Sequence, residues 1–446
     1  MPEVEGVDSM VIRIKKIKSG IIVSALLCVF LGATPARKAL AAGFYLYEIG
    51  TPDVGLASAG YASRAQDAST VFTNPAGMTR LDSSQFLVGI QPVYYYQVFS
   101  PNSHTTKTGT DGGNAFVPLP SGSFFYVYSL SSKLKLGIGN VTYFGGALEY
   151  NLNWVGRYYL QGATFVGNST LPTVAYRINK WLSVGAGFNI MIGYLKEKVA
   201  INNLLPRLPD GQLRLNGWWT AGLGGDIGVL VEPTADTRFG IQYLTPVSMD
   251  FSGTPFFRGV GPGLSAVLRR RGVLGATVDI DLTAPQSLLG SVFHQINDSV
   301  AVMADAGWQN WSAFGDPQIG INSNNPTSVT ANLRYQDTFH LALGTQYRPS
   351  RHWILSTGFA FDNSMVSATS RSVSAPFGNN WRFGAGAQYA LNEALELGFA
   401  YEFLWQGSPP LYQTTRGGPV RGTVAGHFPS ANANFFSINL SWKSRQ

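Results

Sequence analysis

Cysteine is almost absent from this chain of 446 residues, because Cys28 is the only one. It lies inside an apolar run, residues 21–33, which follows four basic residues and precedes Ala39-Leu40-Ala41. A basic region, an apolar region and an A-x-A site make up a secretory signal peptide. The run is too short for a membrane-spanning helix, which takes roughly 20 apolar residues. We therefore predict a removable signal peptide over residues 1–41 and a mature chain without thiols, disulfides or cysteine-based metal sites.

Charged residues are also scarce. They make up 13% of the chain, against roughly 25% in an ordinary soluble domain. The formal net charge is +7, but much of the basic excess belongs to the predicted signal peptide and indicates no nucleic-acid partner. Catalytic and nucleotide-binding motifs are missing too, since no G-x-S-x-G, H-E-x-x-H, Walker or G-x-G-x-x-G element stands in a fitting context and the five histidines are scattered. We predict no enzyme, no cofactor and no metal site.

What the chain does contain, from residue 85 onward, is strict alternation of apolar with small or polar residues. One such stripe is formed by Leu395, Leu397, Phe399, Tyr401, Phe403 and Trp405. Period-2 alternation gives a strand one apolar and one polar face. A secreted β-sandwich also alternates, but many of these strands exceed ten residues, which is long enough to cross a bilayer when tilted. We therefore predict a transmembrane β-barrel whose apolar stripes face lipid.

The connections between the strands test the prediction of a transmembrane barrel independently of the alternation. Short polar turns, as at Asn179-Lys180 and Asn297-Asp298, alternate with long loops rich in Gly, Pro and Asn. Short periplasmic turns and long outer loops are the signature of a bacterial outer-membrane barrel. Counting them predicts fourteen antiparallel strands with both termini on the periplasmic side. The approximate ranges are 85–99, 121–131, 133–146, 170–178, 181–198, 213–231, 237–252, 276–297, 299–314, 338–349, 352–364, 380–391, 394–406 and 434–443.

Residues 42–84 follow neither the strand pattern nor a helical one. They are rich in glycine and contain Asn74-Pro75-Ala76, in which Asn-Pro starts a turn and Pro75 cannot donate to a strand ladder. We predict a compact, irregular segment. The predicted organisation is thus a signal peptide (residues 1–41), an N-terminal hatch or plug (42–84) and a barrel (85–446).

This order of features resembles the FadL family of outer-membrane transporters for long-chain fatty acids and hydrocarbons. The resemblance rests first on Ala42-Gly43-Phe44, Asp67-Ala68 and Asn74-Pro75-Ala76. It continues along the mature chain through Trp154-Val155-Gly156-Arg157-Tyr158, Trp308-Gln309-Asn310-Trp311-Ser312 and Asp337-Thr338. It implies a fourteen-stranded barrel in which a glycine-rich hatch closes the lumen.

The resemblance also marks candidate functional residues. Phe44 is a ligand-binding candidate, and Asn74, Pro75 and Ala76 are candidates for holding or gating the hatch, although all four could simply fold the plug. Arg157 is a second ligand-binding candidate because a cation could meet an acidic head group. An arginine in an outer loop is more often a solvated charge or a contact to lipopolysaccharide.

A fault in the alternation of residues 133–146 suggests how an apolar ligand leaves. Leu136 and Ile138 place the apolar face on even positions, but Val141 and Tyr143 continue it on odd ones. Such a change requires an extra residue, and a β-bulge bends the strand and leaves ladder groups unpaired. We place the bulge at Gly139-Asn140, where glycines make a bend easy. In the FadL family a kink in this strand opens a lateral hole, and the fault resembles that feature, although an ordinary bulge that only shapes the barrel would also explain it.

The predicted function is passive transport of long-chain fatty acids or other hydrophobic compounds across the outer membrane, by a monomer in contact with membrane lipids and lipopolysaccharide. Three alternatives stay open: an adhesin or structural barrel, a hydrophilic porin, and a lipid hydrolase with a lumen-edge Ser/His pair. For the last, His340 and His352 are predicted on inner faces of neighbouring strands, where polar lumen positions also explain them. The sequence does not identify the ligand, the residue that meets a head group, or which of Met1 and Met10 starts the chain.

Overall fold

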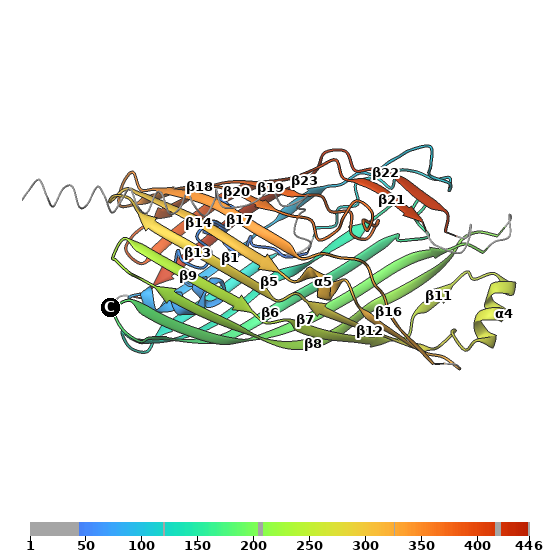
Figure 1. Ribbon diagram of the computed structural model, residues 1–446, viewed down its shortest axis with the longest axis horizontal. Helices are drawn as coiled ribbons and strands as arrows, with labels where there is room; N and C mark the ends of the chain where they lie inside the picture. The colour runs from blue at the N-terminus through green and yellow to red at the C-terminus, as the bar shows by residue number, and fades with distance from the viewer. Residues whose placement is uncertain (1–43, 119–120, 204–207, 325, 415–420, 445–446) are drawn as a thin grey trace, which may run out of the picture. The chain divides into compact units, whose positions relative to one another are not determined.

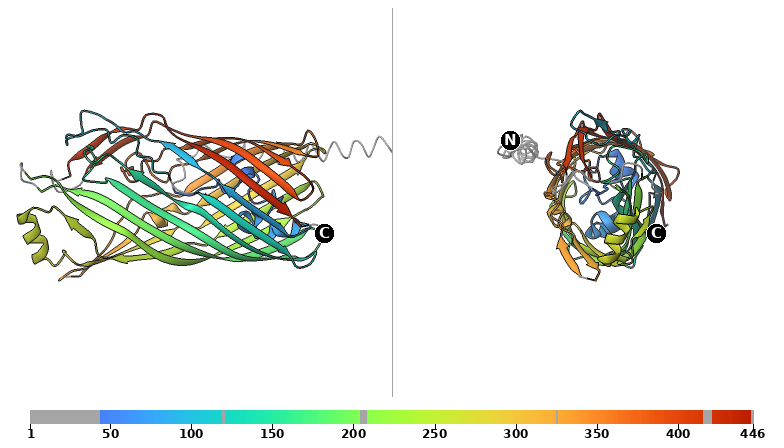
Figure 2. Two further views of the ribbon diagram at one scale, coloured as in Figure 1. Left: turned by 180° about the vertical axis from the view of Figure 1, so that it is seen from behind. Right: turned by 90° about the vertical axis from the view of Figure 1, so that its right-hand side faces the viewer.

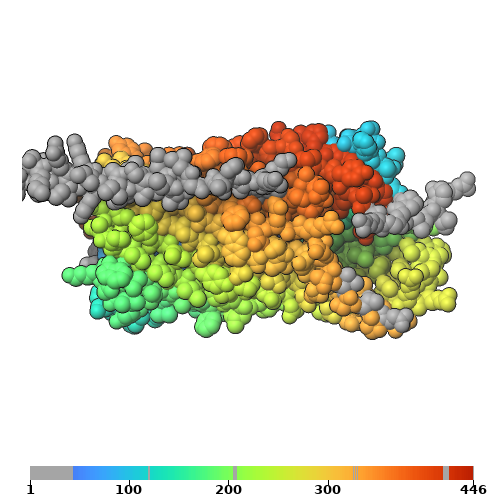
Figure 3. Space-filling model, viewed as in Figure 1, coloured from blue at the N-terminus to red at the C-terminus, as the bar shows by residue number. Residues whose placement is uncertain are grey.

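A computed structural model describes residues 44–118, 121–203, 208–324, 326–414 and 421–444. The predicted signal peptide lies outside these described residues. Within them, fourteen antiparallel strands close into a barrel, which confirms the predicted fold class (Figure 1; Figure 2). The barrel closes where the first and last strands pair, with Gln85 opposite Lys443. Around the visible wall, colours follow one another from green through yellow to orange, because strands adjacent in sequence are neighbours in space (Figure 3).

The first wall strand is interrupted and consists of β1 (Gln85–Ile90) and β2 (Val93–Tyr96). The others follow in chain order: β4 (Gly122–Ser129), β5 (Leu134–Glu149), β6 (Gly162–Arg177), β7 (Leu182–Ile201), β8 (Gly211–Val231), β9 (Thr237–Leu244), β13 (Ser287–Gln295), β14 (Val300–Gln309), β17 (Thr338–Tyr347), β18 (Trp353–Asp362), β19 (Asn380–Ala390), β20 (Leu395–Gly407) and β23 (Ala431–Lys443).

The predicted inside and outside of the wall are confirmed along β20. Phe399 and Trp405 are 54% and 45% exposed on the outer surface, whereas Glu402 and Leu404 between them are buried. An outward apolar band is what a lipid-facing wall requires.

The predicted short turns are confirmed, and three of them share one design. The Asn179 side-chain oxygen accepts hydrogen bonds from the backbone N–H groups of Trp181 and Leu182. Asn297 and Asn392 make the same pair of bonds in their own turns. Asparagine side chains commonly imitate a backbone turn in this way, so a single residue type fixes three tight reversals at one end of the barrel.

Two predicted strands are each broken by a proline. The expected strand 237–252 divides into β9 and β10 (Val247–Gly253), and the expected strand 276–297 divides into β12 (Thr277–Ala284) and β13. Pro246 and Pro285 stand at the breaks, and proline cannot donate to a ladder. Beyond them β10 and β12 leave the barrel sheet and pair in a separate four-stranded sheet with β15 (Gln318–Asn322) and β16 (Thr327–Thr330).

The remaining elements belong to loops and to the N-terminal segment. The end of the expected strand 299–314 is the short helix α5 (Trp311–Phe314). Other loop elements are β3 (Ser100–Pro101), β11 (Phe256–Arg258), α4 (Pro262–Arg270), β21 (Pro410–Thr414) and β22 (Thr423–His427). The N-terminal segment holds α2 (Thr51–Gly55), α3 (Thr70–Thr73) and the 3-10 helix η1 (Pro75–Arg80). Across the described ranges, no helix has both the length and the apolar character needed to cross a membrane.

Candidate functional site

Residues 44–81 lie inside the ring of strands, as the view along the barrel shows in blue (Figure 2). Helix α2 packs against β18, β19, β20 and β23, whereas η1 packs against β5 to β8 on another part of the wall. The segment therefore extends across the lumen. Nearly all of its residues from Tyr45 to Thr79 are buried.

Wall glycines explain how an irregular chain packs so closely on strands. A Cβ atom at Gly358 would lie 1.8 Å from the carbonyl oxygen of Leu56, and one at Gly240 would lie 1.9 Å from that of Ala62. Neither position admits a side chain, because the backbone of the segment touches the backbone of the wall. The small inner faces visible in the sequence thus form the docking surface of residues 44–81.

Asn74, Pro75 and Ala76 are brought together at strand β8. The Asn74 amide nitrogen donates to the carbonyl oxygens of Ala62 (2.7 Å) and Val229 (3.0 Å), and its side-chain oxygen accepts from the Ala76 N–H (3.1 Å). Pro75 begins η1, where its missing N–H costs nothing. These bonds join Asn74 to β8 and not to the bend in β5.

The lumen also holds a buried cluster of charges. The Arg382 guanidinium lies 3.1 Å from a Glu48 oxygen, 3.2 Å from an Asp362 oxygen and 3.8 Å from a Glu402 oxygen. Each of these four side chains is at most 2% exposed. Glu48 comes from the N-terminal segment and the other three come from the wall, so these ion pairs hold the segment to β18, β19 and β20.

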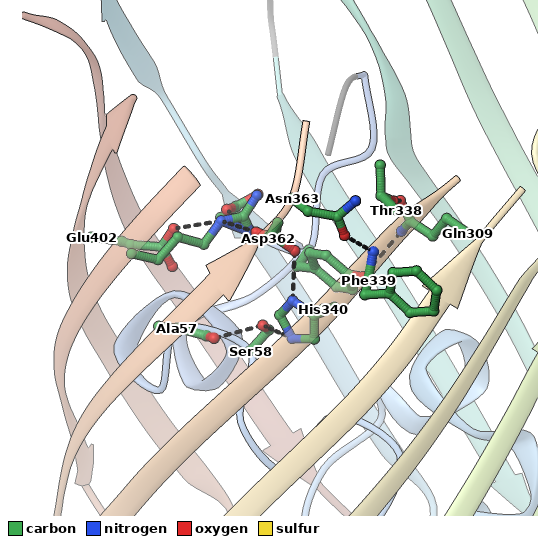
Figure 4. Close-up of polar contacts among 12 residues, drawn as sticks. Ala57, Ser58, Gln309, Thr338, Phe339, His340, Asp362, Asn363 and Glu402 are labelled. Carbon is green, nitrogen blue, oxygen red and sulfur yellow. Dashed lines mark hydrogen bonds and ion pairs between the residues drawn. The ribbon is translucent and has the colours of Figure 1, made fainter. Parts of the chain in front are cut away.

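A Ser-His-Asp arrangement adjoins this cluster (Figure 4). One His340 ring nitrogen lies 3.1 Å from the Ser58 hydroxyl oxygen, and the other lies 2.7 Å from an Asp362 carboxylate oxygen. These distances match those of a catalytic triad. Sequence reasoning named His340 as a member of such a pair but missed Ser58, which lies in no motif. Ser58 and His340 are only 1% and 2% exposed, however, and neither is among the residues that line the apolar cavity described next. The arrangement fastens the segment to β17 and β18. The prediction for His352 was wrong, since it lies exposed at the turn before β18.

An apolar cavity of about 290 Å³ lies beside the N-terminal segment. Its walls include Phe44, Val93, Phe116, Phe144, Leu148, Phe165, Leu195, Phe314, Tyr335, Phe377 and Phe435. Phe44 is central, because its ring lies 5.1 Å from that of Phe377 and 5.8 Å from that of Phe314. The volume is near the lower bound of about 300 Å³ for ligand cavities. Such a lining suits the hydrocarbon part of a ligand.

The cavity reaches the wall at a gap between β4 and β5. Pairing of these strands ends at Ser123 opposite Val141. Beyond that point β5 pairs with β6 alone among wall strands. Residues 44–46 take the place of β4, because the Leu46 N–H donates to the Tyr143 carbonyl and the Gly145 N–H donates to the Phe44 carbonyl, both at 2.8 Å. The N-terminal segment thus covers a strand edge that the barrel leaves unpaired.

The predicted bulge is present in β5, but its position was wrong. Gly139 and Asn140 sit in regular register opposite Leu171 and Thr170, and the register shift falls between Thr142 and Phe144. The predicted position of the bulge was wrong because of Val141 and Tyr143. Their apolar character reads as a lipid-facing stripe, yet both are buried in the lumen, where Tyr143 packs on Tyr45 and Phe72.

Arg157 lies apart from the cavity, in the loop between β5 and β6. Its guanidinium pairs with Asp210 at 2.7 Å, donates to the Thr108 and Trp154 carbonyls and covers the Tyr158 ring at 4.5 Å. It is not among the residues that line the cavity. As for metals, the described ranges contain no group of three or more His, Cys, Asp or Glu side chains placed to hold an ion.

A closed barrel with an outward apolar band, a filled lumen and an apolar cavity at a gap in its wall defines an outer-membrane transport barrel. Comparison with known proteins agrees. The chain belongs to the family described as outer membrane protein transport protein (OMPP1/FadL/TodX), whose family model matches residues 32–443. Membership in this family makes the protein a transporter of the outer membrane and not an enzyme.

Individual relatives support the same assignment. A long-chain fatty acid transport protein of Escherichia coli O6:H1 is 28% identical over 408 residues, which cover 82% of this chain and 88% of the relative. Among solved structures, a Pseudomonas aeruginosa FadL homologue has a TM-score of 0.81 at 20% identity and covers 90% of this chain and 100% of its own. The Ralstonia pickettii toluene transporter TbuX has a TM-score of 0.66 at 20% identity, with 90% and 99% covered. At these identities the structural likeness shows the fold alone.

Proposed function

We propose that this barrel passively carries long-chain fatty acids or similarly hydrophobic compounds, which bind in the apolar cavity and leave sideways through the gap between β4 and β5. The position of the cavity carries this proposal, because it is lined on one side by Gln91 and Ser121 and on the other by residues 144–148 of β5. An apolar molecule released there enters the membrane instead of water. Relatives named for fatty acid and toluene transport support the ligand class.

The free energies of the possible contacts indicate which part of a ligand contributes most to binding. Burial of a methylene group contributes about 0.8 kcal/mol, whereas an exposed pair between a carboxylate and an arginine contributes about 1 kcal/mol or less. A tail that buries several methylenes therefore outweighs any head-group contact. Affinity comes from the tail, and polar groups set orientation and head-group preference.

Residues 42–84 act as a hatch in this proposal. The segment fills the lumen, Asn74 bonds it to β8, and Pro75 and Ala76 pack beside that bond against wall glycines of β8 and β7. Phe44 has two roles, since its ring lines the cavity while its carbonyl oxygen occupies the unpaired edge of β5. Displacement of residues 44–46 would uncover that edge and open the cavity toward the gap.

The outer loops would make the first contacts with an incoming ligand and with lipopolysaccharide. Arg157 already pairs with Asp210, so an acidic head group would have to replace that carboxylate. The exposed run Arg269 to Arg271 at the end of α4 is a candidate surface for lipopolysaccharide phosphates. We also propose that the barrel works as a monomer, because the cavity and the gap both lie within one chain.

Native mass spectrometry of the purified protein, stabilised in an amphipathic polymer, tests the proposal. We expect bound apolar molecules, and we expect Ala163→Trp to displace them because Ala163 lines the cavity. Leu397→Trp is the matched control, since Leu397 belongs to the outward stripe of β20 and should leave the bound molecules in place. A wild-type protein without bound apolar molecules, or equal retention in both variants, would contradict the cavity's role.

A further inference from the structure

The apolar cavity has one charged end. Among its described lining residues only Glu48 and Arg382 carry formal charges, and they are ion-paired to each other. A cation at the end of an apolar cavity would ordinarily attract the carboxylate of a fatty acid. Whether Arg382 can do so depends on how far its charge is already neutralised.

Three acidic side chains surround the single guanidinium of Arg382. Glu48, Asp362 and Glu402 lie within 4 Å of the guanidinium, and all three are buried. His340 faces the cluster through Asp362, and the Tyr47 ring lies 5.3 Å from the guanidinium carbon and stacks on the His340 ring. Three acidic side chains thus share one arginine. A ligand carboxylate would have to displace one of them and leave it buried without a counter-charge, which is strongly unfavourable.

The other polar groups at this end are uncharged and engaged with one another. The Tyr95 hydroxyl donates to Gln406 at 2.6 Å, and the Gln406 amide donates to Asn380 at 2.8 Å. Gln97 donates to the Pro376 carbonyl at 3.2 Å. All four of these side chains line the cavity. Amide and hydroxyl groups of this kind can bond a neutral head group without any need for counter-charge.

We propose that the cavity selects hydrophobic ligands without a negative charge, such as hydrocarbons, long-chain alcohols or esters, and discriminates against the fatty acid anion. Glu48, Asp362 and Glu402 set this preference by occupying Arg382. The inference rests on the proposed function, because it assumes that the cavity is where the ligand binds, and it narrows the ligand class.

Competition between two matched ligands tests the selectivity. Purified protein is offered equal amounts of tetradecanoate and its methyl ester, at a pH well above the carboxyl pKa, and the bound ratio is read by native mass spectrometry. We expect at least tenfold more ester than acid. Glu402→Gln should shift this ratio at least fivefold toward the acid, because it removes one of the three acidic side chains around Arg382 and lets the ligand carboxylate take that place. Glu48→Gln should shift the ratio in the same direction, and it is the variant to measure if Glu402→Gln does not fold.

Glu396→Gln is the matched control. Glu396 lies on the same strand and inner face as Glu402, but it accepts a hydrogen bond from Gln388 and is not one of the three acidic partners of Arg382, so the ratio should not change. Equal or preferred binding of the acid by the wild-type protein overturns the inference, and so does a ratio that neither Glu402→Gln nor Glu48→Gln moves. Failure of both ligands to bind has a different meaning, because it removes the proposed function and the inference with it.

Discussion

The Asn74 amide nitrogen donates to the Val229 carbonyl oxygen across 3.0 Å, and this bond joins the N-terminal segment to strand β8 of the wall. The same amide donates to the Ala62 carbonyl within the segment. One side chain therefore closes a loop of the segment and fastens that loop to the barrel. A Cβ atom at Gly228 would lie 2.0 Å from the Asn74 oxygen, so the wall has no room for a side chain at position 228.

Loss of the Asn74 amide should loosen the segment without unfolding the barrel. Asn74→Ala leaves the Ala62 and Val229 carbonyls without their partner, at a cost of about 1–3 kcal/mol. Amide hydrogens of residues 44–81 should then exchange roughly ten to a hundred times faster, while those of β13 and β14 stay protected. Asn432→Ala, on a barrel strand away from the segment, is the control. Unchanged protection in Asn74→Ala would mean that other contacts hold the segment alone.

The lipid-facing stripe of β20 gives a prediction about insertion. Phe399 is 54% exposed on the outer face of the barrel. An arginine at the bilayer midplane on this face costs roughly 2–4 kcal/mol. Phe399→Arg should therefore fold into lipid vesicles less stably by that amount in a denaturant titration, whereas Phe399→Leu should change little. Equal stability of the two variants would show that Phe399 does not face the membrane core.

Asp337 ties an outer loop to β14 and gives a pH prediction. Its carboxylate accepts hydrogen bonds from Ser312, Asn310 and the Trp308 ring. Burial raises the pKa of Asp337, but these hydrogen bonds outweigh it and hold the pKa below its usual value. A lowered pKa in the folded state stabilises the protein above the unfolded pKa of about 3.9, and this contribution is lost as pH falls through the folded value.

Asp337→Asn should accordingly open the loop at neutral pH, seen as faster hydrogen exchange in the peptide that contains Ser312. The difference from the wild-type protein should shrink as pH falls below about 4. Asn332→Asp, in the preceding exposed stretch, controls for a change of charge. A difference that persists undiminished at acid pH would show that the carboxylate charge is not what holds the loop.

Much of the barrel could be predicted because its physics is local. The alternation along β20 and the turn-forming asparagines depend on neighbours only a few residues away. The sequence alone therefore predicts that Phe399 faces outward and that Asn179 lies in a tight turn. The prolines at 246 and 285 were equally visible. Each proline stands inside one long alternating run, so the pattern alone predicts an unbroken strand. In the fold the two breaks lie opposite one another, because Leu244 pairs with Ser287 on one side of them and Val247 with Ala284 on the other.

The candidate site was harder to predict because a lumen filled by the N-terminal segment and the surrounding lipid both select apolar side chains on the wall. Position 143 holds an aromatic residue because its side chain packs against the N-terminal segment. The alternation pattern cannot distinguish such an inward apolar position from one that faces lipid. The pairing of Ser58 with His340, and of Glu48 with Arg382, joins residues hundreds of positions apart that share no motif. Only the three-dimensional packing of residues 44–81 brings them together.

Deletion of Tyr143 tests whether the gap beside β5 is the exit for the ligand. The deletion removes the extra residue, and Phe144 then takes the inward position of Tyr143, which restores regular pairing with β6. A straightened β5 should extend its ladder with β4 past Val141 and close the gap. Tyr143→Phe is the control, because it keeps the bulge and loses only the hydroxyl that bonds Asn189.

Uptake of radiolabelled hexadecane by cells that carry each variant is the decisive measurement, with surface level and heat-modifiable folding checked in parallel. Uptake should fall to that of cells without the protein when Tyr143 is deleted and stay normal in Tyr143→Phe. Undiminished uptake by a correctly folded deletion variant would contradict lateral exit through the gap between β4 and β5.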